Sequence, residues 1–492
     1  MTITSTLSVT LPATRKPANI QLLGMGVEPQ NYANNLLFNG SEMLWNEGGL
    51  APGRNMMPGN LRWPQGTCAD EYEWEKGIGA YSARQQIPSL GSTFLGVMGS
   101  DEICNLCAMW GSTLVYTANL YTRSAADMLA HIDYLYSRKM GKRGPREIMV
   151  ELGNEPYLDI GPATGTTALW FAGQVDTFAR ALRGKYPDIK IIVPYRSSND
   201  PTGTIWVHRA NFSEQMVAKL AQLSTPVDMW AFHNAYLPES YSAAATDADY
   251  ISAMMAAPLV YAMDQAAAQA AIRAYPIYAN SKFCVTEWKG GFDTSADSHR
   301  RTVAAAVQDA DVMREMINAD LAFANHHNLI SGNNGVYSYS SSTRYRTPHY
   351  WLFSWLRALT VGEYLTVTQT AGSSATISAY ASQPGRAGRI PAGTVYPLIS
   401  GYGTIQDTQV QLILLNKSQT DNCTTTINYS GTSKRHGRMF SLAAVSNPFD
   451  LTDAETKYTI TQAAVGASNP LTVTLPAMSI NYLRFNLGIG AQ

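Results

Sequence analysis

Two glutamates, each placed where a short apolar run ends, are the residues of this chain best suited to chemistry. Glu155 lies in the string GNEP at 153–156, directly after the apolar run 148–150, and Glu287 lies in VTEW at 285–288. Two carboxylates on either side of one bond can share its cleavage, because one protonates the departing oxygen while the other attacks the carbon. Cleavage of a glycosidic bond needs such a pair, and direct attack gives a covalent intermediate that water opens with net retention.

The two acids have opposite requirements. Glu155, as general acid and base, must hold a proton at the start of the reaction, which an apolar or anionic setting favours. Glu287, as nucleophile, must be ionised, and the expected donors to it are Arg62, Asn154 and Tyr236. A lone glutamate at a strand end is more often solvated or ion-paired. The expectation therefore depends on the elements that bring the two acids together.

The segment from about 20 to 339 alternates short apolar runs with helix-like stretches, a pattern typical of repeated β-α units around a parallel sheet. We expect eight strands, at 20–26, 59–63, 113–117, 148–152, 189–193, 227–232, 283–286 and 321–330. Helices are expected at 124–139, 168–184 and 301–325. Eight such units predict an α/β fold, a closed (β/α)8 TIM barrel whose loops after the strands build one mouth. Both glutamates would face that mouth, after the fourth and seventh strands.

A second domain is indicated by a change of composition. From about 362 the chain is rich in Thr, Ser, Val and Gly and alternates with period two, as at 409–415 and 471–475. This pattern predicts a C-terminal antiparallel β-sandwich. We expect residues 16–350 to form the catalytic barrel, and residues 1–15 plus 351–492 to form the sandwich, because the strand-like start precedes the first barrel strand.

Composition excludes several classes of protein. The 36 Lys and Arg nearly balance the 37 Asp and Glu, so we expect no nucleic-acid partner. No stretch approaches the roughly 20 apolar residues of a membrane span, so we expect no membrane partner. The first residues resemble a strand and not a signal peptide. The expected protein is soluble, and two locations stay open: secreted, if a signal was removed before residue 1, or cytoplasmic. The oligomeric state stays open as well.

Cysteine and histidine spacing gives no support for a metal or a disulfide framework. The five cysteines are an odd number spread over the chain, and Cys104 and Cys107 fall on the apolar stripe of an expected helix. The pair His326 and His327 lacks spaced partners that would complete a metal site. We therefore expect neither a metal nor an organic cofactor.

Several strings resemble one known group of enzymes. They are LRWPQG at 61–66 with YEW at 72–74 and GIG at 77–79, DE at 101–102 with the run 113–119, GNE at 153–155, TEW at 286–288, and LPAMS with LRF at 475–485. In these strings the sequence resembles the clan A glycoside hydrolases, and most of all the family 51 arabinofuranosidases with their family 39 and 79 relatives. The resemblance covers nearly the whole chain.

The resemblance implies roles for particular residues. It implies Glu155 as acid/base and Glu287 as nucleophile. The expected substrate-binding residues, from the resemblance and from their positions, are Glu28, Arg62, Asn119, Asn154, His233, Tyr236 and Trp288. His233, at a strand end, is expected to hold a sugar hydroxyl or to orient the nucleophile, with a hydrogen-bonded structural role as the alternative. Trp45, Trp63 and Trp74 are further candidates for stacking on a sugar, after Trp288.

The chain also departs from the family pattern. The family's usual Pro-Gly-Gly is PQG here, with Gln65 in the middle, and its His-x-Tyr is HNAY at 233–236. We therefore expect a retaining O-glycosyl hydrolase that acts on an oligo- or polysaccharide, with the sugar left open. Two alternatives stay open, an endo-acting polysaccharide hydrolase of the same clan and an inactive carbohydrate-binding barrel.

Overall fold

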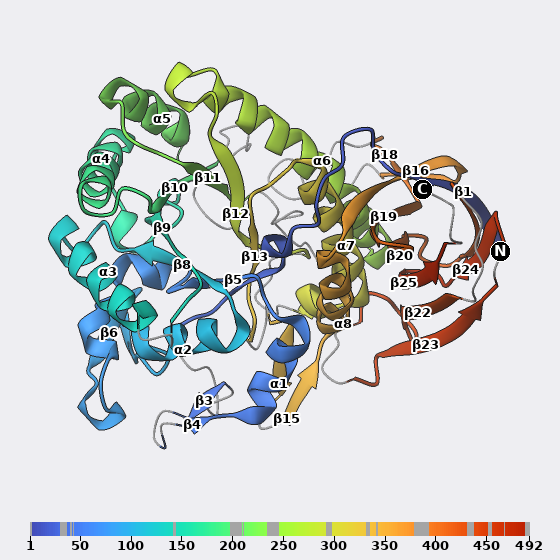
Figure 1. Ribbon diagram of the computed structural model, residues 1–492, viewed down its shortest axis with the longest axis horizontal. Coiled ribbons are helices and arrows are strands. Elements are labelled where there is room, and N and C mark those ends of the chain that lie inside the picture. Colours follow the sequence, from blue (N-terminus) through green and yellow to red (C-terminus); the bar gives the residue numbers. More distant parts are fainter. Residues whose placement is uncertain are drawn as a thin grey trace.

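A computed structural model describes most of the chain. The described residues are 2–29, 37–39, 42, 44–140, 144–196, 209, 211–233, 246–291, 298–330, 335–340, 343–377, 393–430, 437–450, 455–466 and 468–487. Figure 1 shows a barrel wrapped in helices beside a large sheet, with the N-terminal strand lying in that sheet. Both parts bury extensive apolar surface, so each has a core of its own.

The barrel is closed by eight parallel strands, in the order β2, β5, β8, β9, β10, β11, β12 and β13 around the ring. Their bounds are Gly24–Gly26, Asn60–Trp63, Thr113–Ala118, Ile148–Leu152, Lys190–Tyr195, Met229–Phe232, Lys282–Trp288 and Ala324–His326. Each expected strand is confirmed. The first is shorter than expected, because Ile20–Leu23 forms a 3-10 helix whose first turn is capped by the Asn19 side chain.

Helices alternate with the barrel strands. They are α1 Glu47–Met56, α2 Ser100–Trp110, α3 Ala125–Met140, α4 Ala168–Lys185, α5 Phe212–Leu223, α6 Asp247–Arg273, α7 Val303–Asn318 and α8 Pro348–Leu356. The helices expected at 124–139 and 168–184 are confirmed as α3 and α4. The helix expected at 301–325 is shorter in the structure, where it forms α7. It ends at Asn318, and Asp320 takes a left-handed conformation with φ of 57° that turns the chain into β13.

Short antiparallel hairpins decorate the loops and were not expected. They pair β3 Phe38–Asn39 with β4 Leu44–Trp45, β6 Gln86–Ser89 with β7 Ser92–Leu95, β14 Tyr337–Ser340 with β15 Thr343–Arg346, and β17 Ser374–Thr376 with β18 Val395–Pro397. The β6–β7 hairpin is closed by a two-residue turn and lies in the connection that follows β5. This hairpin adds a wall to the mouth of the barrel.

The second part is a nine-stranded sheet in the order β23, β22, β25, β20, β19, β16, β1, β21 and β24. The bounds, in chain order, are β1 Thr2–Thr10, β16 Glu363–Gly372, β19 Ile399–Gln406, β20 Gln409–Asn416, β21 Asn422–Tyr429, β22 Gly437–Ala444, β23 Tyr458–Val465, β24 Leu471–Leu475 and β25 Ser479–Asn486. Its pairs are antiparallel except for β1 with β21. The strands expected at 409–415 and 471–475 are confirmed as β20 and β24.

Period-two alternation in β20 joins the two cores. Leu412 and Leu414 point into the core of the sheet, while Ile413 and Leu415 belong to the larger core that contains the barrel. A buried ion pair lies at the same interface: Lys417, just after β20, donates to Asp311 of α7 over 2.8 Å. Both faces of this strand are therefore covered, which explains its continuous apolar sequence.

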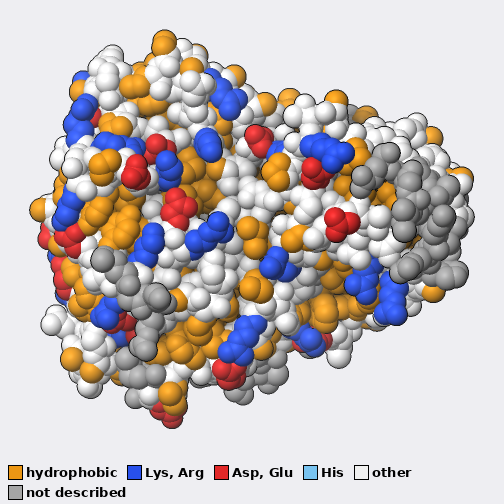
Figure 2. Space-filling model, viewed as in Figure 1, with side chains coloured by type: hydrophobic (Ala, Val, Ile, Leu, Met, Phe, Trp, Pro, Cys, Tyr) orange, Lys and Arg blue, Asp and Glu red, His pale blue; other side chains and the backbone are white. Residues whose placement is uncertain are grey.

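The surface carries charges of both signs. On the described part of the face in Figure 2, Lys and Arg side chains are interspersed with Asp and Glu. This mixture agrees with the formal net charge of -1. Among the described residues, no helix has the length and the apolar character needed to cross a membrane.

Candidate active site

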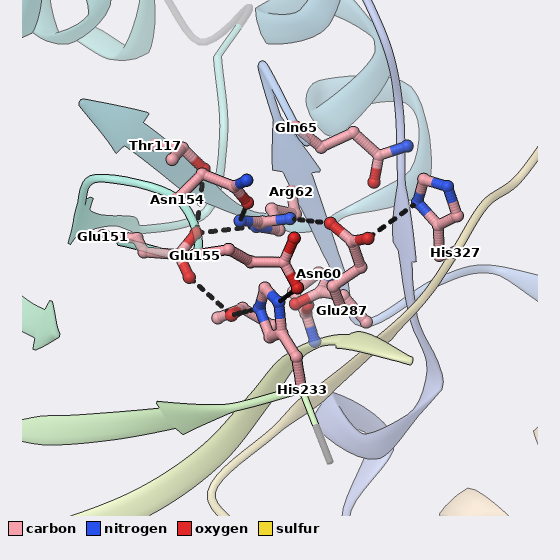
Figure 3. A network of polar contacts seen from close by, with 12 residues as sticks. Asn60, Arg62, Gln65, Thr117, Glu151, Asn154, Glu155, His233, Glu287 and His327 are labelled. Carbon is pink, nitrogen blue, oxygen red and sulfur yellow. Dashed lines mark hydrogen bonds and ion pairs between the residues drawn. The ribbon is translucent and has the colours of Figure 1, made fainter. Parts of the chain in front are cut away.

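Arg62, at the end of β5, contacts Glu287 and also Asn154, the residue before Glu155. Its side chain has no exposed surface, and its three nitrogens donate in three directions (Figure 3). Nη1 donates to Oε2 of Glu287 over 2.7 Å, Nη2 to Oδ1 of Asn154 over 2.8 Å, and Nε to Oε2 of Glu151 over 2.6 Å. Burial works against the charge of Arg62, but Glu151 and Glu287 outweigh it and raise its pKa. The guanidinium therefore stays charged beside Glu287.

Glu151 is a third acid in this network, and the sequence analysis gave it no role. It lies in β9 and is fully buried. Besides Arg62, it accepts hydrogen bonds from Oγ1 of Thr117 over 2.9 Å and from Oγ1 of Thr286. The signal that could have revealed it is a charged residue inside the otherwise apolar strand IMVEL at 148–152. Glu151 fixes the plane of the Arg62 guanidinium, and with it the position of the group that contacts Glu287.

The substitution Glu151→Gln tests this positioning role. The neutral amide of Gln cannot accept all three hydrogen bonds that the Glu151 carboxylate accepts. Arg62 also loses one of its two carboxylate partners, so we expect its guanidinium to shift. We expect kcat to fall by about 10- to 100-fold with a smaller change in KM, and the free energy of unfolding to drop by about 3 kcal/mol. Steady-state kinetics and urea unfolding measure both, with the exposed acid variant Glu47→Gln as the matched control. An unchanged kcat would contradict the role.

Glu155 follows β9 on a strained loop. Its φ is 37°, in the left-handed region that side chains other than glycine rarely adopt. Gly153, two residues earlier, has φ of 83°, and a Cβ there would lie 2.9 Å from the Phe171 ring. The GNEP string thus bends the chain sharply at the strand end and turns Glu155 toward Glu287, where Figure 3 shows the two side chains facing the same space.

His233, at the end of β11, contacts Glu155. Its Nδ1 lies 2.9 Å from Oε1 of Glu155, so within the described residues His233 contacts the expected acid/base. Its Nε2 lies 2.8 Å from Oγ1 of Thr286. The Thr286 hydroxyl gives its only proton to Glu151, so it accepts from Nε2 of His233, which must carry a hydrogen.

This assignment fixes where the remaining proton can be. If His233 is neutral, its Nδ1 is an acceptor, and the hydrogen bond to Glu155 requires that Glu155 carries the proton. If His233 is charged, Glu155 is the anion. Either way the pair shares one proton between Nδ1 of His233 and the Glu155 carboxyl group. The hydrogen-bond chain from Glu151 through Thr286 to His233 therefore fits the role of general acid that is expected of Glu155.

Glu287, in β12, is 7 % exposed and has partners on both sides. Arg62 contacts one carboxylate oxygen, and Nδ1 of His327 lies 3.7 Å from the other. Burial lowers the pKa of His327, and the charge of Glu287 opposes that effect. Of the other expected donors, Asn154 contacts Arg62 and reaches Glu287 only through it. Tyr236 lies outside the described residues.

Two more expected substrate ligands are placed differently. Glu28, after β2, is half-buried and accepts a hydrogen bond from Nδ2 of Asn328 over 3.0 Å. Asn119, after β8, has partners in its own loop: its Oδ1 accepts from the backbone of Tyr121 and Thr122, and its Nδ2 donates to Oγ1 of Thr122 over 2.7 Å. The Asn119 amide holds its own loop in a turn, and the contacts to neighbours occupy both of its polar atoms.

The tryptophan expected to stack on a sugar is part of the core. Trp288 has no exposed surface and meets the His326 ring edge-on at 4.9 Å, which corrects that expectation. Trp63 is equally buried, while Trp45 and Trp74 are half-buried against neighbouring aromatic rings. The alternation of strand side chains places Trp288 on the opposite face of β12 from Glu287, which explains why one is packed and the other lines the mouth.

Behind Trp288 lies a buried cluster around Asp309 of α7. Oδ2 of Asp309 is 2.9 Å from Nε2 of His326, 3.0 Å from Nε2 of His349 and 3.6 Å from Nζ of Lys289. The sequence analysis found no partners for His326, and the structure supplies two, because α7 and α8 bring Asp309 and His349 to within 4.8 Å of it. These are ligand types that zinc accepts. Here the Lys289 ammonium balances the carboxylate, and burial lowers the pKa of Lys289 to about 7.

Three buried histidines predict how stability depends on pH. Burial lowers the pKa of His131 to about 3, of His326 to about 3 and of His349 to about 4. In the unfolded chain they titrate near 6.5, so below that pH the unfolded state binds more protons and stability falls with falling pH. Three protons correspond to a slope of up to about 4 kcal/mol per pH unit near pH 5.

Urea unfolding at pH 7, 6 and 5 measures this slope. We expect the free energy of unfolding to fall most steeply below pH 6, and His131→Gln to reduce the slope by about one proton. His131 bonds only to Oγ of Ser100 and stacks on Trp74, far from the charged groups of Asp309. Equal stability at pH 7 and pH 5 is the result that this account does not allow.

A pocket of about 710 Å³ opens beside the Glu155 loop. Its walls come from the connections that follow β5, β8 and β9, and therefore from the mouth of the barrel. The lining residues are Glu71, Leu90, Gly91, Thr122, Ile160, Gly161 and Pro162. Residues 160–162 continue the loop that carries Glu155, so the pocket lies on the side of Glu155.

The geometry defines a barrel with one glutamate after its fourth strand and another on its seventh. The comparisons with known proteins agree with it. No family model matches the sequence. The chain is 31% identical over 80 residues to an intracellular exo-alpha-L-arabinofuranosidase from Bacteroides ovatus, a stretch that spans 16% of each protein.

Solved structures match over the whole chain. A family 51 alpha-L-arabinofuranosidase from Bifidobacterium longum superposes with a TM-score of 0.78 at 18% identity, covering 98% of this chain and 100% of that one. A family 51 arabinofuranosidase from Xanthomonas axonopodis pv. citri gives 0.77 at 15% identity with the same coverage. A family 44 xyloglucanase from Paenibacillus polymyxa gives 0.65 at 11% identity, covering 99% and 100%. The chain therefore has the (β/α)8 barrel and β-sandwich of the family 51 arabinofuranosidases, and the expected resemblance is confirmed in the fold.

Proposed function

We propose that the protein is a retaining glycoside hydrolase with Glu155 as general acid/base and Glu287 as nucleophile. The observation that carries the proposal is the shared network: Arg62 contacts Glu287 and the neighbour of Glu155, while His233 prepares Glu155. The proposed substrate is an oligo- or polysaccharide. We also propose that residues 16–350 are the catalytic domain and that 1–15 plus 351–492 are the sandwich domain.

The proposed reaction has two steps. In the first, a carboxylate oxygen of Glu287 attacks the anomeric carbon, the bond to the leaving oxygen breaks, and Glu155 gives its proton to that oxygen. In the second, Glu155 takes a proton from water, whose oxygen attacks the same carbon and releases Glu287. Each step inverts the carbon once, so the product retains the starting configuration. Arg62 stabilises the charge of Glu287 before the first step and after the second.

The pocket beside the Glu155 loop supports a substrate longer than one sugar. Glu155 protonates the leaving oxygen, so units attached to that oxygen extend toward its side of the mouth. A pocket of about 710 Å³ walled by Leu90, Ile160 and Pro162 offers apolar faces for a sugar ring. Action at a chain end and action inside a polysaccharide both stay compatible with it.

A panel of aryl glycosides and polysaccharides tests the proposal. Aryl α-L-arabinofuranosides lead the panel, since the structural relatives carry arabinofuranosidase names, and xylosides, hexopyranosides and glucuronides follow. Release of the aryl group or of reducing ends supports a hydrolase. Binding to a polysaccharide without any product would favour the alternative, an inactive carbohydrate-binding barrel. Products of intermediate length from a polymer would favour endo action.

A further inference from the structure

Gln65 is a buried amide at the mouth without a hydrogen-bond partner for its side chain among the described residues. It is 1% exposed, and neither Oε1 nor Nε2 has a partner within the described parts of the chain. Its backbone is held in place, because Sγ of Cys68 donates to the Gln65 carbonyl over 2.8 Å. A buried amide without partners is costly, and such a group in an active site points to a ligand that completes its hydrogen bonds.

The neighbouring strand is shaped to receive this amide. A Cβ on Gly26, in β2, would lie 1.6 Å from Oε1 of Gln65, so any larger residue there would displace the side chain. In Figure 3 the amide points from the end of β5 toward Glu287 and His327. The side chain is thus aimed into the site, with Gly26 leaving the room it needs.

The position of Gln65 relative to Glu155 and Glu287 decides which part of the substrate its side chain can contact. Glu155 marks the side where the leaving group departs, and Figure 3 places Gln65 and His327 beyond Glu287 from it. The sugar that becomes attached to Glu287 must extend over this opposite side. Asn328, after β13, adds an Oδ1 atom that is buried and has no partner among the described residues, while its Nδ2 donates to Glu28. Polar groups from three adjacent strands therefore face the glycone.

We propose that the Gln65 amide binds hydroxyl groups of the glycone, an inference that rests on the proposed function. An amide offers a donor and an acceptor, which match a hydroxyl that both accepts and donates. A glycone is rich in such hydroxyl groups, so it is the part of the substrate that completes the hydrogen bonds of the Gln65 amide.

The variant Gln65→Met tests this directly, since it keeps the length of the side chain and removes both polar atoms. On the best aryl glycoside of the panel we expect kcat/KM to fall by about 10- to 100-fold, as for the loss of two neutral hydrogen bonds. The same comparison of kcat/KM between native enzyme and variant is then made on each mono-deoxy analogue of the substrate. For one analogue the loss should be less than about 3-fold, because that analogue lacks the hydroxyl that Gln65 binds. The melting temperature should stay the same or rise, because no protein partner is lost. Gln462→Met, on the exposed part of β23, is the matched control.

Each outcome bears on one claim. An equal loss of kcat/KM on the parent and on every deoxy analogue, or a lowered melting temperature with no change in selectivity, would give Gln65 a structural role and overturn the inference. Unchanged kinetics in Gln65→Met would overturn it as well. If the native protein cleaves no glycoside at all, the proposed function fails first and the inference falls with it.

Discussion

Replacing Glu287 by Gln is expected to abolish turnover, with kcat lowered by roughly four orders of magnitude or more. An amide cannot form the ester to the anomeric carbon, so the first step has no nucleophile. Arg62 also loses its 2.7 Å contact with an anion, but it keeps Glu151 and Asn154. The fold should therefore survive, and kinetics with the best aryl glycoside, together with thermal unfolding, measure both effects.

The matched control for this variant is Glu315→Gln, an acid of α7 that lies on the side of the sandwich and contacts Arg314. It should leave kcat unchanged. Near-normal activity in Glu287→Gln would remove Glu287 from the reaction, while an unfolded variant would shift the test to Glu287→Asp, which keeps the charge but moves the carboxylate back. That variant should fold and still be strongly impaired.

Replacing Glu155 by Ala is expected to lower activity in a way that depends on the leaving group. General acid catalysis contributes about 10²- to 10⁴-fold, so substrates with a poor leaving group should lose about that much. An acidic phenol departs without a proton, so its first step should be little affected. The second step still lacks its base, and the covalent intermediate should accumulate. Added azide needs no base to attack and should restore turnover.

Two measurements separate these effects. The pre-steady-state burst of phenol should be present in Glu155→Ala with the acidic phenol, and the recovered product with azide should be a glycosyl azide. Equal losses for good and poor leaving groups, with no azide product, would argue against Glu155 as acid/base. The variant His233→Asn should show a milder form of the same dependence, because His233 contacts only the proton-bearing side of Glu155 and Thr286.

Much of the fold could be predicted because its signals are local. Apolar runs and turn residues located the eight barrel strands, and period-two alternation located β20 and β24. The predictions failed where an apolar sequence continued past the end of an element. Residues 20–23 have the pattern of a strand but form a 3-10 helix. The Ala-rich sequence continues after Asn318, so the end of α7 could not be located from it. The boundary after Asn318 carries no proline or glycine that would mark it, and Gly24 at the other boundary lies inside the apolar run 20–26.

The site could be predicted only in part, because its contacts join residues far apart in the sequence. Strand-end position was enough to propose Glu155 and Glu287. The contact between Arg62 and Glu287 spans 225 residues. The burial of Trp288 and the turn formed by Asn119 depend on neighbours that no string reveals, and the same holds for the bond between His233 and Glu155.

The stereochemistry of the first product tests the central claim most directly. Proton NMR of the reaction with the best aryl glycoside, recorded before the released sugar can mutarotate, reports the configuration at its anomeric carbon. Two successive displacements, first by Glu287 and then by water, predict a first product with the configuration of the substrate. A first product of the opposite configuration would contradict the covalent mechanism and the role of Glu287 as nucleophile.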